Sequence, residues 1–287
     1  MLTPSEALLI ADLFYTLDKQ VRHDLSLGKI ADERDCVARL VGSFSYPFGI
    51  FNQYGFHHLR FRSKWFARVN SSGHEQWFGC DSMLVFRVDN QLKVGLFEAK
   101  WPRILNDPHH CWDYPQKSTK LSHFTNQIRR QAAWTSQAAI WETFFFEAPV
   151  NTAHPPFDLH GATCVRHDVA RQLVDEQPDL ETLWDNADLQ TLIQRAQGSS
   201  AIGKQMTNLR QMVLDMLTCE FGEAIDIEPD SRRFVLTSIS PALTPERAYC
   251  PILTFSGDDN NSPAFIEDFM ASNGLTFFQQ VDIIRSQ

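Results

Sequence analysis

Two short apolar runs separated by a polar turn constrain the middle of this 287-residue chain more than any other stretch. The runs cover residues 83–88 and 92–97, and Asp89-Asn90-Gln91 lies between them. Asp and Asn tolerate the left-handed backbone that a tight reversal needs. The pattern therefore predicts a β-hairpin with Asp81 at the start of its first strand and Glu98 and Lys100 at the end of its second.

The three charged residues are expected to meet at one end of this hairpin. In antiparallel strands Asp81 and Glu98 lie opposite each other, and because side chains alternate, Glu98 and Lys100 point to the same face. Two carboxylates held close together repel unless a divalent cation separates them, and carboxylate oxygens suit Mg²⁺. A neighbouring lysine can orient a water molecule or stabilise charge on phosphorus. The pattern indicates a magnesium site; the alternative is an exposed strand end with a weak surface ion pair.

The same residues resemble the motif of a known family. Gly79-Cys80-Asp81, followed by Gly95-Leu96-Phe97-Glu98-Ala99-Lys100, is similar to the PD-(D/E)xK nuclease superfamily, which has the restriction-endonuclease-like fold. Cys80 stands where the family's name has a proline. The resemblance covers residues 33–147 and implies a mixed central sheet flanked by helices. It also implies that Asp81 and Glu98 are metal ligands and that Lys100 is the catalytic lysine.

A third acidic residue is implied by the same resemblance. Residues 32–41 are predicted to form a helix, with Glu33, Val37, Leu40 and Val41 on one face. Many nucleases of this superfamily carry an additional acid on the helix before the sheet, which makes Glu33 a candidate metal ligand and catalytic residue. The alternative is a first-turn acid that interacts with the helix dipole.

A glutamine is the fifth candidate catalytic residue. Residues 120–141 are predicted to form a helix, and several branches of the superfamily place a glutamine or a similar polar residue on the helix after the ExK strand. Gln131 matches that position by order, with Gln127 as the second choice. A long amide there could position water or a phosphate oxygen. The alternative is an exposed stripe of glutamines beside Arg129 and Arg130.

Basic residues are gathered around the proposed site, although the chain has a net charge of −9. Residues 56–130 carry 12 Lys and Arg against 6 Asp and Glu, whereas residues 151–287 carry 9 against 20. Such a concentration favours contact with phosphate groups, and a solvated basic face is the alternative. The candidate contacts with nucleic acid are Arg60, Arg62 and Lys64 on a strand expected within residues 57–69, and Arg103, Lys117 and Lys120 in the loop after Lys100.

The predicted fold class is α/β, with a mixed central β-sheet flanked by helices and an α+β extension at the C-terminus. Residues 1–30 are expected to form an N-terminal helical segment and residues 31–177 a nuclease-like core. Residues 178–287 form an acidic α+β region that could also pack on the core as one domain. Its negative charge could repel nucleic acid, face away from it, or bind a protein partner.

Cysteine usage and hydropathy indicate a compartment. Six cysteines are scattered without a CxxC pair, which favours reduced thiols in the cytoplasm, and secretion by a non-classical route is left open. No apolar run approaches the length of a membrane span, and the N-terminus lacks the features of a signal peptide. A cytoplasmic protein without membrane contact is therefore expected.

These observations converge on one predicted function and one alternative. The chain is predicted to be a metal-dependent nuclease that hydrolyses phosphodiester bonds of nucleic acid, with DNA favoured over RNA. Mg²⁺ is the expected cofactor, and Mn²⁺ is expected to substitute for it. The alternative is a catalytically inactive nuclease-like scaffold that binds protein or nucleic acid, which the acidic C-terminal region favours.

Overall fold

The computed structural model of the chain describes residues 2–43, 59–67, 78–101, 109–110, 112–145, 161–198, 206–227, 233–237, 249–253, 270, 275 and 277–285. Within these ranges, no helix combines the length and the apolar composition that a membrane crossing requires.

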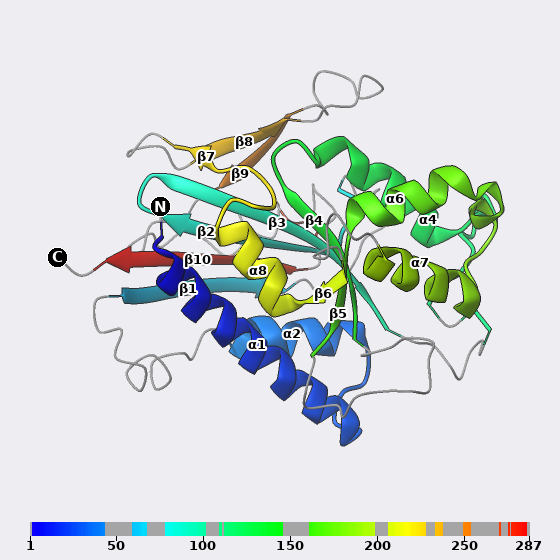
Figure 1. Cartoon of the computed structure of the whole chain (residues 1–287), viewed down its shortest axis with the longest axis horizontal. Helices are drawn as coiled ribbons and strands as arrows, with labels where there is room; N and C mark the ends of the chain where they lie inside the picture. Colours follow the sequence, from blue (N-terminus) through cyan, green and yellow to red (C-terminus); the bar gives the residue numbers. More distant parts are fainter. Residues whose placement is uncertain are drawn as a thin grey trace.

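One mixed β-sheet forms the centre of the fold (Figure 1). Its strands are β1 (Leu59–Ala67), β2 (Ser82–Val88), β3 (Gln91–Lys100), β4 (Ala139–Phe144), β5 (Thr163–Arg166), β6 (Met206–Asn208), β7 (Ile225–Asp226) and β10 (Phe277–Arg285). They lie in the order β1-β10-β2-β3-β4-β5-β6, and β7 pairs with the start of β3. The pairs β10/β2 and β3/β4 are parallel, and the others are antiparallel. A separate antiparallel pair consists of β8 (Arg233–Thr237) and β9 (Tyr249–Leu253).

Helices cover both faces of this sheet, as the sequence predicts for a mixed α/β protein. Among the described residues, the α-helices are α1 (Pro4–Ser26), α2 (Glu33–Ser43), α4 (His123–Gln131), α6 (His167–Glu176), α7 (Asn186–Gly198) and α8 (Leu209–Leu217). The same residues form two short 3-10 helices, η1 (Ala132–Trp134) and η2 (Pro178–Glu181). The first helix begins with a capping box, in which the Thr3 hydroxyl and the Glu6 carboxylate each accept a hydrogen bond from the other residue's backbone.

Alternating side chains of the strands pack into two layers of helices. Apolar residues of α1, α2 and α8 cover one face of the sheet, where they contact Phe86 of β2 and Phe97 of β3. Figure 1 shows α1 and α8 side by side on that face. On the opposite face, Leu96 and Ile140 pack with Trp134 of η1, and apolar residues of α4, α6 and α7 form one cluster with Phe144 of β4. Because side chains alternate along β3, Glu98 and Lys100 lie on the same face as Leu96, and these two residues contact α4.

The predicted hairpin is confirmed by the pairing of β2 and β3. Their antiparallel register runs from Ser82 opposite Phe97 to Val88 opposite Gln91. The two residues between the strands are Asp89 and Asn90, and Asp89 has the positive φ of 54° that the turn chemistry predicts. Local turn residues and apolar runs were therefore sufficient to locate the hairpin.

The sheet extends across the expected boundary near residue 177. Strand β10, close to the C-terminus, lies between β1 and β2, and β6 extends the sheet beyond β5. The C-terminal region also supplies β7 against β3 and α8 against α1. Strands β6, β7 and β10 of this region therefore belong to the same sheet as the strands of the core.

The predicted helix over residues 120–141 is wrong in its second half. Helix α4 ends at Gln131, η1 follows it, and β4 begins at Ala139. The apolar residues Ala139–Trp141 fit either a buried helix or a buried strand, and pairing with β3 selects the strand. This difference matters for the site, because β4 carries Glu142. A helix over these residues would not have placed Glu142 beside Glu98.

Candidate active site

Asp81, Glu98 and Lys100 lie at one end of the sheet, on the side covered by α4. Glu98 and Lys100 continue the row of even-numbered β3 residues, and both contact Gln127 of this helix. Asp81 directly precedes β2, and extending the register of Ser82 with Phe97 by one residue places it opposite Glu98. Its backbone carbonyl accepts a hydrogen bond from Phe277 N of β10, at 3.0 Å. Strand pairing thus brings the three predicted residues to one place.

Glu98 and Lys100 form a buried ion pair. Glu98 is 2% exposed and Lys100 is 6% exposed. Lys100 Nζ donates to Glu98 Oε1 at 2.9 Å and to Gln127 Oε1 at 2.7 Å, while Gln127 Nε2 donates to Glu98 Oε1 at 2.5 Å. The ammonium also lies 4.7 Å from the centroid of the Phe124 ring. The pair is therefore unlike the exposed surface pair that was the alternative for this motif.

A second buried glutamate, Glu142, lies beside Glu98. Strands β3 and β4 are parallel, and their register sets Glu142 directly next to Glu98 on the face toward α4. Glu142 is completely buried, and no described donor meets hydrogen-bond geometry with its carboxylate oxygens, although the Gln131 amide is near enough to lower its pKa. No described donor meets that geometry with Glu98 Oε2 either. The site thus contains one more carboxylate than the sequence pattern predicts.

Burial and neighbouring charges shift the pKa values of this cluster upward. The pKa of Glu98 is raised well above its usual value by burial and by the charge of Asp81, against the opposing effect of Lys100. Burial alone would lower the pKa of Lys100, but the charges of Glu98 and Glu33 raise it above its usual value. Burial raises the pKa of Glu142 to about 8, although Lys100 opposes the shift. A cluster with more carboxylates than cations retains protons until another cation replaces them.

Two glutamines on α4 reach the site in different ways. Gln127 contacts Glu98 and Lys100 directly, as described above. Gln131, the first choice of the sequence analysis, is completely buried; its Nε2 donates to Gly79 O at 2.9 Å and its Oε1 lies 2.7 Å from His167 Nδ1. Neither glutamine belongs to an exposed stripe. Gln131 is hydrogen-bonded to the backbone of Gly79, two residues before Asp81. Gln127 is hydrogen-bonded to the side chains of Glu98 and Lys100 on β3.

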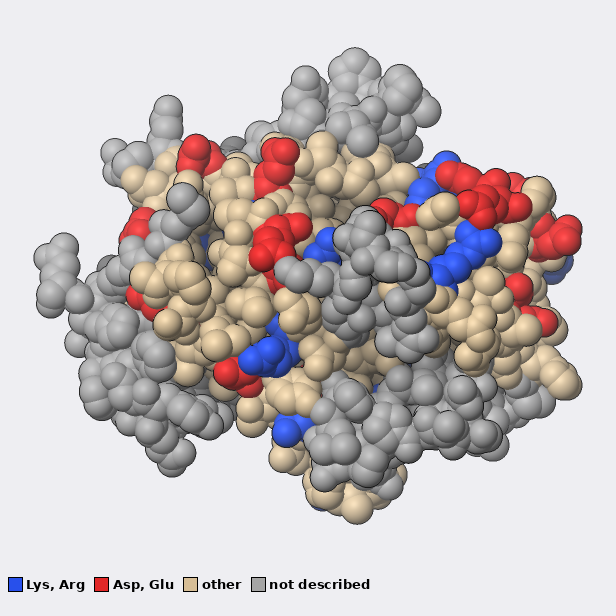
Figure 2. All heavy atoms as spheres, in the orientation of Figure 1, with Lys and Arg blue, Asp and Glu red and all other residues tan. Residues whose placement is uncertain are grey.

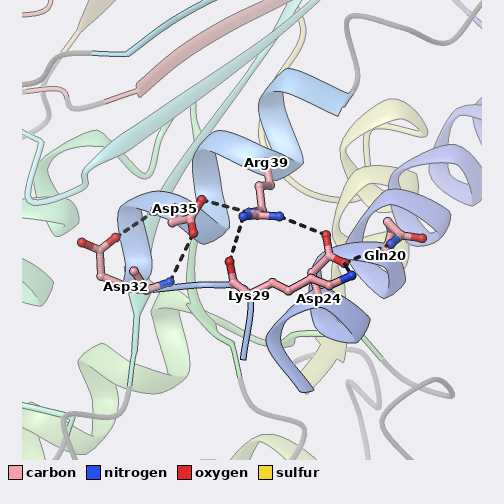
Figure 3. A network of polar contacts seen from close by, with 7 residues as sticks. Gln20, Asp24, Lys29, Asp32, Asp35 and Arg39 are labelled. Atoms are coloured by element: carbon pink, nitrogen blue, oxygen red, sulfur yellow. Dashed lines mark hydrogen bonds and ion pairs between the residues drawn. The ribbon is translucent and has the colours of Figure 1, made fainter. Parts of the chain in front are cut away.

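Glu33 is the first residue of α2, and its charge acts on both Glu98 and Lys100. The polar network in Figure 3 fixes the start of this helix. Asp32 Oδ1 accepts a hydrogen bond from Asp35 N at 2.9 Å, and Asp35 Oδ1 pairs with Arg39 Nε at 2.9 Å. Arg39 Nη1 also pairs with Asp24 Oδ2 of α1, at 3.1 Å. The backbone that carries Glu33 is therefore tied to the end of α1.

The candidate contacts with nucleic acid are only partly described by the structure. Lys117 and Lys120 are exposed in a turn that is closed by a bridge between Pro115 and Ser122, just before α4. The turn is held by Asp113, whose Oδ2 accepts from Ser122 Oγ at 2.6 Å. Arg60, Arg62 and Lys64 belong to β1, which lies outermost in the described sheet; their side chains, and all of Arg103, are outside the described residues.

Acidic and basic side chains are mixed on the face shown in Figure 2. Over α6 and α7 they form ion pairs, including Arg171 with Asp175 at 2.8 Å and Arg195 with Glu176 at 2.5 Å. Paired arginines of this kind have part of their charge already neutralised. The described part of this face therefore gives no support for a phosphate-binding surface.

The residues of the site fit a divalent cation that is held by two carboxylates. Within the described ranges, no three His, Cys, Asp or Glu side chains are arranged to hold an ion. Mg²⁺ commonly uses only one or two protein carboxylates and completes its octahedron with water and phosphate oxygens. Asp81 and Glu98 are neighbours of this kind, and Glu98 Oε2 is a buried acceptor without a hydrogen-bond partner among the described residues.

Two residues of the site gave no usable signal in the sequence. Glu142 lies in a stretch that favours helix and strand alike, and its position beside Glu98 depends on a pairing between segments 44 residues apart. His167 is a single histidine at the first position of a helix, and only the packing of α6 on α4 brings it to Gln131. Comparisons of the chain with protein-family models, with curated proteins and with solved structures found no match.

Proposed function

We propose that this chain is a Mg²⁺-dependent nuclease of the PD-(D/E)xK type, which hydrolyses phosphodiester bonds at Asp81, Glu98 and Lys100. The observation that carries the proposal is the buried pair of Glu98 and Lys100 at the end of an apolar sheet, with Glu98 Oε2 left without a described partner. Burying charged groups is unfavourable, and an unsatisfied carboxylate oxygen adds to the penalty. A structural ion pair gains nothing from that oxygen, whereas a metal site needs it.

The order of elements around the site supports the proposal. Helix α2, with Glu33, precedes the hairpin, and α4, with Gln127 and Gln131, follows the ExK strand. Strand β4 then returns parallel to β3. A mixed sheet flanked by helices, an acid on the preceding helix and a glutamine on the following helix are the features that the resemblance implies. DNA is the favoured substrate class, and Mn²⁺ is expected to substitute for Mg²⁺.

Each side chain has a distinct part in the proposed reaction. When bound, Mg²⁺ would lower the pKa of the attacking water and offset charge on the leaving oxygen. Asp81 and Glu98 supply hard oxygen ligands for it. Lys100 holds Glu98 Oε1 and places a positive charge in a dry site, where it stabilises the charge that develops on the phosphate. Gln127 orients Lys100 and Glu98 through one hydrogen bond to each.

Cleavage assays with matched variants test the proposal. We expect the parent protein to cut labelled DNA in the presence of Mg²⁺ or Mn²⁺, and Lys100→Gln and Glu98→Gln to lower the rate by about 100-fold or more. Lys93→Gln is the control, because Lys93 lies on the same strand, is 7% exposed and donates to Gly222 O at 2.7 Å, far from Asp81. A Lys100→Gln variant that cuts at the parental rate would show that the assignment is wrong.

The alternative, a nuclease-like scaffold that binds without cleaving, is favoured by one observation. The ammonium of Lys100 is already engaged by Glu98 and Gln127, and both charged groups of the pair are buried. Calorimetric titration with Mg²⁺ and Mn²⁺ separates the two functions. Binding that is lost in Asp81→Asn and Glu98→Gln supports the nuclease, whereas no binding by the parent protein supports the scaffold.

A further inference from the structure

The segment that carries Asp81 packs directly against α4. Gly79, two residues before Asp81, has a φ of 69°, and a Cβ built on it would collide with the backbone carbonyl oxygen of Gln127. Only glycine combines that backbone conformation with so close an approach. Phe78, next to it, is buried with its ring centroid 4.9 Å from that of Trp134, directly after α4. The position of the backbone at residues 78 and 79, just before Asp81, is therefore set by its contacts with α4 and η1.

Gln131 joins this segment to α4 by a hydrogen bond. Its Nε2 donates to Gly79 O at 2.9 Å, and its Oε1 lies 2.7 Å from His167 Nδ1 at the start of α6. Gln131 is completely buried and His167 is 3% exposed. Because Gly79 O can only accept, the amide nitrogen of Gln131 must face it, which leaves Gln131 Oε1 to accept from His167 Nδ1. Burial and the charge of Arg171 lower the pKa of His167 to about 4, which keeps the ring neutral.

The two glutamines of α4 hold the two strands of the hairpin separately. Gln127 is bonded to Glu98 and Lys100 at the end of β3, while Gln131, one helical turn later, is bonded to the backbone that leads into Asp81. One rigid helix therefore contacts both segments that supply the proposed metal ligands. Displacing either contact would change the separation between the two carboxylates.

We infer that Gln131 and His167 are positioning residues, which set the distance between Asp81 and Glu98 so that both can reach one divalent cation. This inference rests on the proposed function and assigns Gln131 a role different from direct contact with water or phosphate. Some groups do not touch the metal but hydrogen-bond to its ligands and orient them. Loss of such a group typically weakens metal binding by about 10- to 100-fold. The hydrogen bonds from His167 to Gln131 and from Gln131 to Gly79 form such a support for Asp81.

Calorimetric titration of the full chain with Mn²⁺ tests the inference. Gln131→Met keeps the length of the side chain but removes both hydrogen bonds, and we expect its Kd for Mn²⁺ to rise by about 10-fold or more. Gln279→Met is the matched control, since Gln279 is also buried, at 3% exposed, but lies on β10 near Val41, where its Nε2 donates to Val41 O at 3.4 Å. The control should keep the parental Kd within about 3-fold.

Two further measurements make the outcome decisive. His167→Phe keeps a ring but removes the donor, and it should weaken Mn²⁺ binding in the same direction, which supplies a readout if Gln131→Met does not fold. In cleavage assays, Gln131→Met should raise the Mg²⁺ concentration for half-maximal rate more than it lowers the rate at saturating Mg²⁺. If the parent binds Mn²⁺ and both variants bind it equally tightly, the positioning role is refuted and the nuclease proposal stands. If the parent binds no Mn²⁺, both fall.

Discussion

Glu142 lies directly beside Glu98 on a neighbouring parallel strand, and both side chains are buried on the face toward α4. Of their four carboxylate oxygens, three have no hydrogen-bond partner among the described residues. Two adjacent carboxylates cannot both remain charged in a dry environment that offers one ammonium group. The pair must therefore take up either a proton or a further cation.

Replacing Glu142 with glutamine should stabilise the protein at alkaline pH. In the folded protein burial raises the pKa of Glu142 from 4.5 to about 8. Between these values the folded state holds a proton that the unfolded state has lost, so the free energy of unfolding falls as pH rises. Glu142→Gln lacks this titration, and we expect a relative gain of roughly 3 kcal/mol or more at about pH 9. Denaturant unfolding in EDTA at several pH values measures it.

The matched control for this prediction is Asp215→Asn. Asp215 is equally buried, at 1% exposed, but it pairs with Arg166 at 2.6 Å and accepts from Gln211 at 2.6 Å. Losing a satisfied buried partner should destabilise the protein at every pH between about 5 and 9. A Glu142→Gln variant that loses stability in parallel with Asp215→Asn would mean that Glu142 is a satisfied structural acid.

Adding Mg²⁺ should stabilise the parent protein more at high pH than at low pH. The pKa of Glu98 is raised by burial and by Asp81, so protons compete with a cation for this carboxylate. The affinity therefore increases as the pH rises, until Glu98 is ionised without the metal. We expect the thermal midpoint in millimolar Mg²⁺, relative to EDTA, to rise more at about pH 8 than at about pH 6, and Glu98→Gln to abolish the difference. Equal shifts at both pH values, or a shift that survives in Glu98→Gln, would place the bound ion elsewhere.

The hairpin and its charged end could be predicted from the sequence because their signals are local. The turn at Asp89 and Asn90 needs only its own two residues, and the alternation that puts Glu98 and Lys100 on one face is a property of a single strand. The capping box of Thr3 and Glu6 at the start of α1 is equally local. Mixed α/β architecture followed from the same kind of pattern.

The rest of the site depends on contacts between distant segments. No pattern near Glu142 shows that β4 will lie parallel to β3, and the apolar residues Ala139–Trp141 continue a helical period as readily as a strand. The choice between Gln127 and Gln131 depends on a rotation of α4 that packing alone determines. Strand β10 likewise enters the sheet beside β2 from the far end of the chain.

Removing the carboxylate of Asp113 should loosen the turn that leads into α4. Asp113 is 5% exposed, and its two oxygens accept four hydrogen bonds, from Tyr114 N, Phe124 N, Ser122 Oγ and Trp184 N. Asp113→Ala leaves these buried donors without an acceptor, and we expect a loss of about 3 kcal/mol or more in the free energy of unfolding. Asp168→Ala, at an exposed position in the first turn of α6, should cost no more than about 1 kcal/mol. Denaturant unfolding compares the two, and equal losses would contradict the role given to Asp113.

Substituting alanine at two glycines separates backbone strain from the contact with α4. Gly28 has a φ of 67° and would place a Cβ in open space, whereas Gly79 has a φ of 69° and would place it against Gln127 O. Gly28→Ala should therefore lower the free energy of unfolding by only about 1–2 kcal/mol, because alanine must adopt the left-handed backbone conformation at this position. Gly79→Ala adds a collision that pushes α4 from the hairpin, for a further loss of about 1–3 kcal/mol.

Because that movement also separates Gln131 from the backbone before Asp81, Gly79→Ala should lose Mn²⁺ binding while Gly28→Ala keeps it. Equal stability and equal Mn²⁺ affinity in the two variants would show that α4 does not control the position of Asp81.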